Sequence, residues 1–195
     1  MRDTLKLIIS YSEVGAGTRG AGFGPEALQI AAFKKGLKLF SNYPIIEGGD
    51  TFRHFYRHPD KTAADFLDVF PGLYNEIADN VRDTLLAGSQ CLIITGDHSN
   101  AAGSIAGVKD AYPDKRIGVI WIDAHGDLHT PYTSPSMNVH GMPLGVALGL
   151  DNKHLAVRDL STEHVEIWEA MKHAGRHRVC PKITPEDLVF IDIRD

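Results

Sequence analysis

Residues 117–127 read IGVIWIDAHGD, and the class of fold follows from them. The first six residues form a continuous apolar run, which is typical of a strand that is buried on both faces of a parallel sheet. Three polar side chains, Asp123, His125 and Asp127, follow this run at once. Ligands of open parallel sheets bind beyond the carboxyl ends of the strands, so we expect a functional site here.

A second apolar run lies upstream and ends in a similar way. Residues 91–95 (CLIIT) lead directly into Gly96, Asp97, His98 and Ser99. Further strands are expected over residues 5–10 and 188–193, and helices over residues 25–36, 74–87, 101–111 and from the Ser161 cap to about Met171. This alternation predicts an α/β fold of three layers, in which helices cover both faces of a mostly parallel sheet.

One domain is expected over residues 1–195, because no internal repeat, low-complexity segment or linker divides the chain. Residues 48–71 are polar and aromatic, and we interpret them as an ordered loop near the site.

Residues 15–20 match G-x-G-x-x-G, but the expected helix begins only at Pro25. A dinucleotide fold needs the third glycine inside that helix, so we interpret this segment as a flexible loop at the border of the site.

The composition excludes several classes of partner. The chain carries 20 Lys and Arg against 25 Asp and Glu, a formal net charge of −5, so neither nucleic acid nor an anionic membrane surface is an expected partner. No apolar run reaches the length of a bilayer span, and the N-terminus lacks the features of a secretory signal. Cys91 and Cys180 cannot form a disulfide framework, and we therefore predict a cytoplasmic protein.

The polar residues after the two strands have the chemistry of a metal site. Asp123, His125 and Asp127 are two residues apart, so an extended backbone would place all three on one side. His98 follows the neighbouring strand and would complete the set, whereas Asp97 and His129, taken alone, are better interpreted as a cap or turn residue and a surface residue. Mixed carboxylate and imidazole ligands suit Mn²⁺, and the absence of a cysteine pair argues against structural zinc.

At these residues the chain resembles the ureohydrolase family, which comprises arginase, agmatinase and formimidoylglutamase. Residues 95–99 (TGDHS) resemble the family's G-G-D-H-S, residues 123–127 (DAHGD) match D-A-H-x-D, and residues 136–143 (SMNVHGMP) resemble S-G-N-x-H-G-M-P, with Met137 where glycine is usual. The spacing over residues 130–143 is closest to arginases, and residues 24–28 (GPEAL) match the entry to the first helix.

The resemblance implies a manganese-dependent hydrolase of a guanidino or amidino substrate, most closely arginine, which would give ornithine and urea. By this resemblance the manganese ligands are His98, Asp123, His125 and Asp127. His140 would shuttle a proton near the leaving amine, and Ser136 and Asn138 would bind the α-carboxylate of the substrate. His129 stands where arginases usually have an asparagine that contacts the same carboxylate. An agmatinase-type or formimidoylglutamase-type hydrolase is the alternative.

The C-terminal end departs from the family pattern. Family members continue past residues 188–195 to a strand with S-x-D-x-D, whose two aspartates complete a binuclear site, so we expect the domain to be incomplete at this end. Either the chain is an enzyme whose missing ligands come from a further segment or another chain, or it is a non-catalytic remnant with one ion or none. An exposed sheet edge would also favour a homo-oligomer.

Overall fold

A computed structural model describes residues 4–49, 51 and 60–194. Its strands are β1 (Leu5–Ser10), β2 (Ile45–Gly48), β3 (Gln90–Thr95), β4 (Val119–Ile122) and β5 (Leu188–Ile191). Its helices are α1 (Gly24–Lys34), α2 (Leu39–Asn42), α4 (Phe70–Leu86), α5 (Ala101–Ala111), α6 (Pro143–Ala147) and α7 (Thr162–Lys172), joined by short 3₁₀ turns. None of the helices described is both long enough and apolar enough to cross a bilayer.

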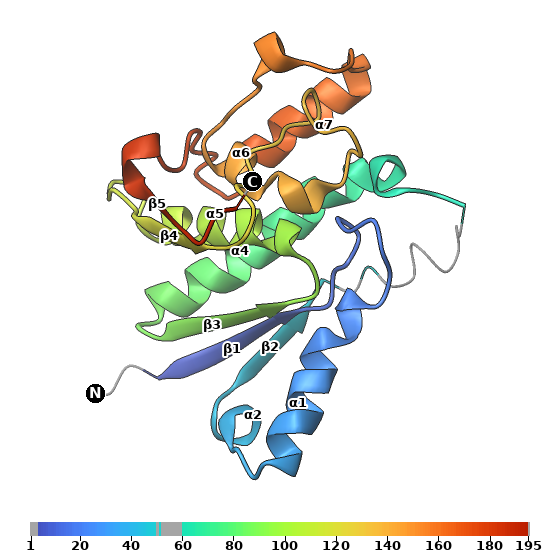
Figure 1. Ribbon diagram of the computed structural model, residues 1–195. Helices are drawn as coiled ribbons and strands as arrows, with labels where there is room; N and C mark the ends of the chain where they lie inside the picture. The colour runs from blue at the N-terminus through green and yellow to red at the C-terminus, as the bar shows by residue number, and fades with distance from the viewer. Residues whose placement is uncertain (1–3, 50, 52–59, 195) are drawn as a thin grey trace.

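The strands form two parallel sheets (Figure 1). One sheet has the order β2-β1-β3, and the other is the pair β4-β5. All three strand pairings are parallel, which confirms the predicted α/β class. The single sheet that the alternation suggested is found as two, because β3 and β4 share no ladder of hydrogen bonds. Strand pairing joins distant segments, and the local apolar pattern does not encode it.

Helices lie on both sides of the β2-β1-β3 sheet (Figure 1). Helix α1 lies on one side, and α4 lies on the other with α5 packed against it. The main core lies on the α4 side of this sheet and includes Ile8, Phe70, Tyr74 and Val81. The predicted helices at α1, α4, α5 and α7 are therefore confirmed as elements, and α5 has the predicted bounds.

The largest difference from the predicted elements lies in residues 48–71. Residues 50 and 52–59 of that segment are outside the described part of the chain. Residues 63–69 form a 3₁₀ helix rather than a loop, and α4 begins at Phe70, four residues before its predicted start. A capping box between Thr62 and Asp65 starts this helix, since the side chain of each residue accepts the backbone N–H of the other.

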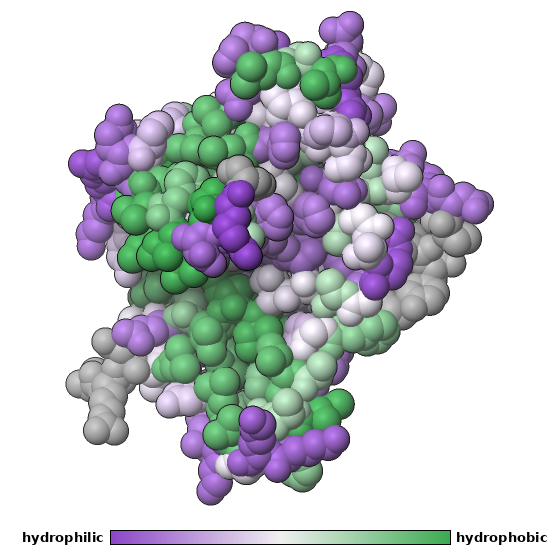
Figure 2. Space-filling model, viewed as in Figure 1, coloured by the Kyte–Doolittle hydropathy of each residue, from purple (hydrophilic) through white to green (hydrophobic). Residues whose placement is uncertain are grey.

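The β4-β5 pair has one covered face and one exposed face. Trp121 of β4 is buried and packs with residues of α5 and α6. On the opposite side, four β-branched residues form what we call the outer face: Ile120, Ile122, Val189 and Ile191, which are 68%, 72%, 56% and 46% exposed. Ile120 pairs in register with Val189 and Ile122 pairs with Ile191, so the outer face is continuous. Figure 2 shows apolar surface over β4 and β5 and over the β2-β1-β3 sheet.

Lys182 is a buried cation near the end of α7. Its side-chain Nζ donates hydrogen bonds to the backbone carbonyls of Lys172 (2.5 Å) and Val179 (3.2 Å). Burial lowers its pKa from 10.5 to about 8. The folded protein therefore releases this proton at a lower pH than the unfolded chain does, so deprotonation favours the folded state as the pH rises from about 8 to about 10.5.

We expect Lys182→Met to remove this pH dependence. The free energy of unfolding of the wild type, relative to that of Lys182→Met, should rise by about 1 kcal/mol or more between pH 7 and pH 10. Urea unfolding at a series of pH values measures the difference. Lys35→Met is the matched control, because Lys35 is exposed. A difference that stays flat across this range would show that Lys182 keeps an ordinary pKa in the folded chain.

Candidate metal centre

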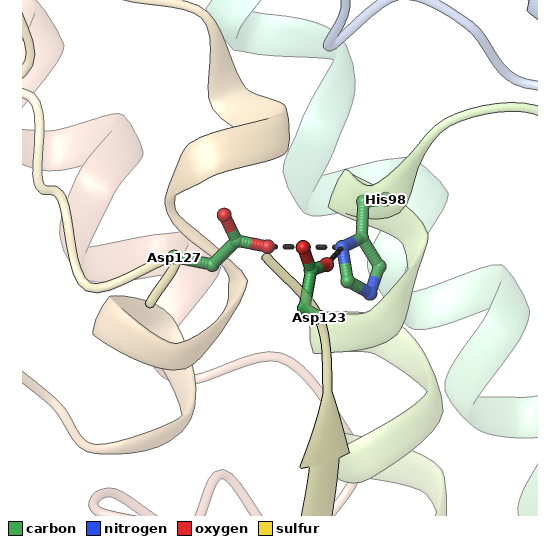
Figure 3. Close-up of side chains that lie close together, drawn as sticks. All are labelled: His98, Asp123 and Asp127. Atoms are coloured by element: carbon green, nitrogen blue, oxygen red, sulfur yellow. Dashed lines mark ion pairs between the residues drawn. The ribbon is translucent and has the colours of Figure 1, made fainter. Parts of the chain in front are cut away.

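Three side chains from two strand ends meet at one point (Figure 3). His98 begins the 3₁₀ turn that follows β3, and Asp123 comes directly after β4. The His98 Nδ1 atom lies 2.9 Å from Asp123 Oδ2 and 2.9 Å from Asp127 Oδ2. Each of the three residues offers one ligand atom, and these atoms all lie within 4.8 Å of one another. The expected meeting of the two polar clusters is thus found.

Local backbone structure holds these side chains in place. Asp97 precedes His98 as the N-cap of the 3₁₀ turn and accepts the Ser99 N–H at 2.8 Å, in agreement with its interpretation as a cap. Asp127 has a φ of 47°, in the left-handed region that residues other than glycine rarely occupy. The His98 ring stacks on Trp121, with centroids 4.5 Å apart and planes 17° apart. Such constraints are typical of functional sites.

The charges of the site are unbalanced. Two carboxylates surround a single imidazole, so the group carries a formal charge of −2 when His98 is neutral. The pKa of His98 is raised, mainly by the interaction of its ring with the Asp127 carboxylate and less by the charge of Asp123. Partial burial of His98 acts to lower this pKa but does not outweigh the carboxylates. Burial also acts to raise the pKa of Asp123, but the His125 N–H and the charge of His98 outweigh it and lower that pKa.

The group fits a divalent cation. The Asp127 Oδ2 atom is buried and has no well-aligned hydrogen-bond donor among the described residues, although His98 Nδ1 is 2.9 Å away. A buried carboxylate oxygen without a well-aligned donor is costly, and a cation would satisfy it. Two carboxylates and one imidazole are also ligands that Mn²⁺ accepts. These three residues are therefore a candidate site for a divalent cation.

The candidate site opens into a cavity of about 850 Å³. Three further histidines line this cavity: His125, His129 and His140. The His125 side chain is 68% exposed, and its Nδ1 atom is 3.3 Å from Asp123 Oδ1. His125 is therefore beside the three-residue group without belonging to it. His129 Nδ1 lies 3.2 Å from the Thr133 hydroxyl. The backbone N–H of His140 donates a hydrogen bond to the Gly15 carbonyl at 3.1 Å.

Ser136 and Asn138 are not among the residues that line the cavity. The Ser136 hydroxyl accepts the Asn138 N–H at 3.2 Å. Gly17 approaches the Asn138 side chain so closely that an added Cβ would lie 2.7 Å from Asn138 Nδ2. The loop of residues 15–20, expected at the border of the site, thus lies against one of the predicted substrate-binding residues.

The residues that line the cavity but were not singled out from the sequence include Thr133, Asn152 and Leu155. Asn152 has a φ of 53°, and the pair Asp151-Asn152 is typical of a turn. That signal places a turn at these residues, but only the tertiary structure brings the turn to the cavity. Thr133 contacts His129, which lies four residues earlier in the chain. No distinctive sequence pattern marks this pair.

Comparisons with known proteins agree on one family. The arginase family model matches residues 7–187. The arginase of Brevibacillus brevis is 34% identical over 196 residues, which cover 100% of this chain and 59% of that protein. The arginase structure from Bacillus caldovelox is 31% identical with a TM-score of 0.72, and the match covers 99% of this chain and 58% of that one.

A third relative was solved with a ligand. The structure of Entamoeba histolytica arginase in complex with L-ornithine is 28% identical, with a TM-score of 0.64 over 99% of this chain and 59% of that one. The chain thus spans a little under three fifths of the length of these relatives.

Proposed function

The chain belongs to the arginase family, and on that premise we propose that the protein is a manganese-dependent hydrolase of a guanidino or amidino substrate. L-Arginine, which would give ornithine and urea, is the substrate we favour. The observation that carries this proposal is the convergence of His98, Asp123 and Asp127 in the wall of the cavity. The similarity to an arginase solved with L-ornithine supports the choice of arginine.

The residues of the chain divide the work of such a reaction. His98, Asp123 and Asp127 would hold the metal, with His125 beside them as the fourth proposed ligand. Bound divalent ions supply Lewis acidity and a hydrolytic nucleophile at neutral pH. His140 lines the cavity and would hold the proton that the leaving amine takes up. His129, Ser136 and Asn138 would orient the substrate through its α-carboxylate.

A colorimetric urea assay tests the proposal. It is run with L-arginine and with agmatine, with and without Mn²⁺, on the 195-residue chain and on the longest chain that its coding sequence yields. We expect urea from arginine in the longer chain only when Mn²⁺ is present. Urea from agmatine but not from arginine would reassign the substrate, and no urea from either would contradict the proposal.

A second candidate is a metal-binding protein without catalytic activity. The described residues contain one group of three potential ligands, whereas a binuclear site with bridging carboxylates needs more. We therefore expect the 195-residue chain to have little or no turnover even with Mn²⁺. Turnover of arginine by this chain, at a rate equal to that of the longer one, would exclude this candidate.

Copies of the chain are proposed to associate through the outer face of β4-β5. A continuous face of four β-branched residues is unfavourable in water, and two copies can cover it in a self-complementary contact. We expect sedimentation to show a concentration-dependent oligomer, and Ile120→Glu to shift it to the monomer. Val157→Glu is the control, since Val157 is 61% exposed and lies outside the β4-β5 pair. A monomer at all concentrations would contradict this association.

The proposed location is the cytoplasm. The two cysteines, Cys91 and Cys180, are both unpaired, as the reducing conditions of that compartment would leave them. The net charge of −5 supports a small-molecule substrate rather than nucleic acid.

A further inference from the structure

A buried carboxylate links the β1 loop to the turn that carries His98. Asp97 is only 7% exposed and follows β3. Its Oδ1 atom accepts hydrogen bonds from the Ser99 N–H at 2.8 Å and from the Ser99 hydroxyl. Its Oδ2 atom accepts the Gly15 N–H at 2.8 Å. One side chain therefore fastens two segments that are 82 residues apart in the sequence.

Gly15 extends this connection to a second residue of the cavity. Its carbonyl oxygen accepts the His140 N–H at 3.1 Å. A Cβ added at Gly15 would lie 2.7 Å from the Ser99 Cβ and 3.0 Å from Asp97 Oδ1, so only glycine fits between Asp97 and the His140 backbone. Asp97 is thus one hydrogen bond from the turn of His98, and two hydrogen bonds from the backbone of His140.

The same loop is held at its other end by a second buried carboxylate. Glu13 Oε2 accepts the N–H groups of Gly20 and Gly22 at 2.7 and 2.8 Å. Within the described part of the chain, the hydrogen bonds of the Glu13 carboxylate go to Gly20 and Gly22 and not to the turn of His98, so the two carboxylates have different roles. Glu13 shapes the loop, whereas Asp97 joins the loop to the candidate metal site.

We propose that Asp97 is a positioning residue, which fixes the turn of His98 and the backbone of His140 relative to each other. The proposal rests on the function proposed above, because it assigns His98 to the metal and His140 to the substrate. Three N–H or O–H groups donate hydrogen bonds to the two Asp97 carboxylate oxygens. In asparagine an NH₂ group replaces one of these oxygens and cannot accept a hydrogen bond there. The remaining amide oxygen should face the two Ser99 donors, so Asp97→Asn should release Gly15 and break the link between the two segments at almost constant side-chain volume.

The test compares Asp97→Asn with Glu13→Gln and with Asp68→Asn, which changes an exposed carboxylate. Mn²⁺ affinity is measured by electron paramagnetic resonance of the free ion, and the folded fraction by circular dichroism. Loss of a partner that orients a metal ligand typically costs tenfold or more, so we expect Asp97→Asn to weaken Mn²⁺ binding about tenfold and the other two variants less than about twofold.

Hydrogen exchange at the His140 amide gives a readout that does not need the metal. We expect faster exchange in Asp97→Asn than in Glu13→Gln at equal global stability, because only the former releases Gly15. If Asp97→Asn does not fold, Ser99→Ala replaces it; this variant removes one of the three donors and should weaken Mn²⁺ binding about threefold.

The outcomes separate the two proposals. If the wild type binds no Mn²⁺, the proposed function fails, while amide exchange at His140 still tests the positioning role. If the wild type binds Mn²⁺ and Asp97→Asn binds it equally well with unchanged exchange at His140, the positioning role is overturned. A variant that only melts at a lower temperature, with unchanged affinity in the folded fraction, overturns it as well.

Discussion

Asp127→Asn is expected to weaken Mn²⁺ binding to the chain by about 100-fold or more, a larger loss than removal of an outer-sphere partner causes. The substitution removes one of two anionic ligands and halves the negative charge that faces the cation. Asparagine has nearly the same volume as aspartate and tolerates the left-handed backbone found at this position, where φ is 47°. The backbone should therefore keep its course, and the loss should report ligand chemistry.

Isothermal titration calorimetry with MnCl₂ measures this loss directly. Asp159→Asn serves as the control, because it makes the same chemical change at an exposed position. We expect the control to bind Mn²⁺ as the wild type does. Equal affinities of Asp127→Asn and the wild type would remove Asp127 from the site.

Gly107→Ala is expected to lower the free energy of unfolding by about 2 kcal/mol or more, because overpacking of a dense core typically costs 1–3 kcal/mol. The added Cβ would lie 2.6 Å from the Val81 Cβ and 2.7 Å from the Ala78 carbonyl oxygen, at the contact between α4 and α5. Backbone atoms cannot move aside as a flexible side chain can, so the two helices must separate.

Gly72→Ala makes the same change within α4 and is the matched control. A Cβ at Gly72 meets nothing within 4 Å, so the variant should gain up to about 1 kcal/mol from helix propensity alone. Urea unfolding of both variants gives the comparison. A Gly107→Ala variant as stable as Gly72→Ala would show that α4 and α5 are less closely packed than described.

Local patterns predicted most of the elements. The apolar runs at residues 91–95 and 117–122 correspond to β3 and β4, although β4 begins two residues later than predicted and β5 ends at Ile191 rather than at residue 193. β2 was not predicted, because IIEG is too short for its period to be read. The separation into two sheets depends on pairing between distant segments, which no local pattern specifies.

The candidate site was predicted in outline for a physical reason. His98, Asp123 and Asp127 follow parallel strands, and the ends of such strands lie on the same side of the fold. The spacing of two residues suggested that His125 would face the same point, but that reasoning requires an extended backbone. The strand ends at Ile122 and Asp127 turns into the left-handed region, so the His125 side chain leaves the group. Its role as a ligand stays a prediction.

One departure from the family motif has a visible structural counterpart. Met137 stands where the family usually has glycine, and its φ is 62°, in the region that favours glycine. The side chain is nevertheless 3% exposed and belongs to the main core. Burial of this apolar side chain offsets the cost of the backbone conformation, and the sequence alone gave no indication of that balance.

Anomalous scattering at the manganese edge, from crystals of the chain grown with MnCl₂, tests the central claim most directly. We predict a manganese peak at bonding distance from His98 Nδ1 and from carboxylate oxygens of Asp123 and Asp127. A second peak about 3.5–4 Å from the first would favour the enzyme over the remnant with a single ion. Crystals without a manganese peak at these three residues would contradict the claim, whether or not they show the metal elsewhere.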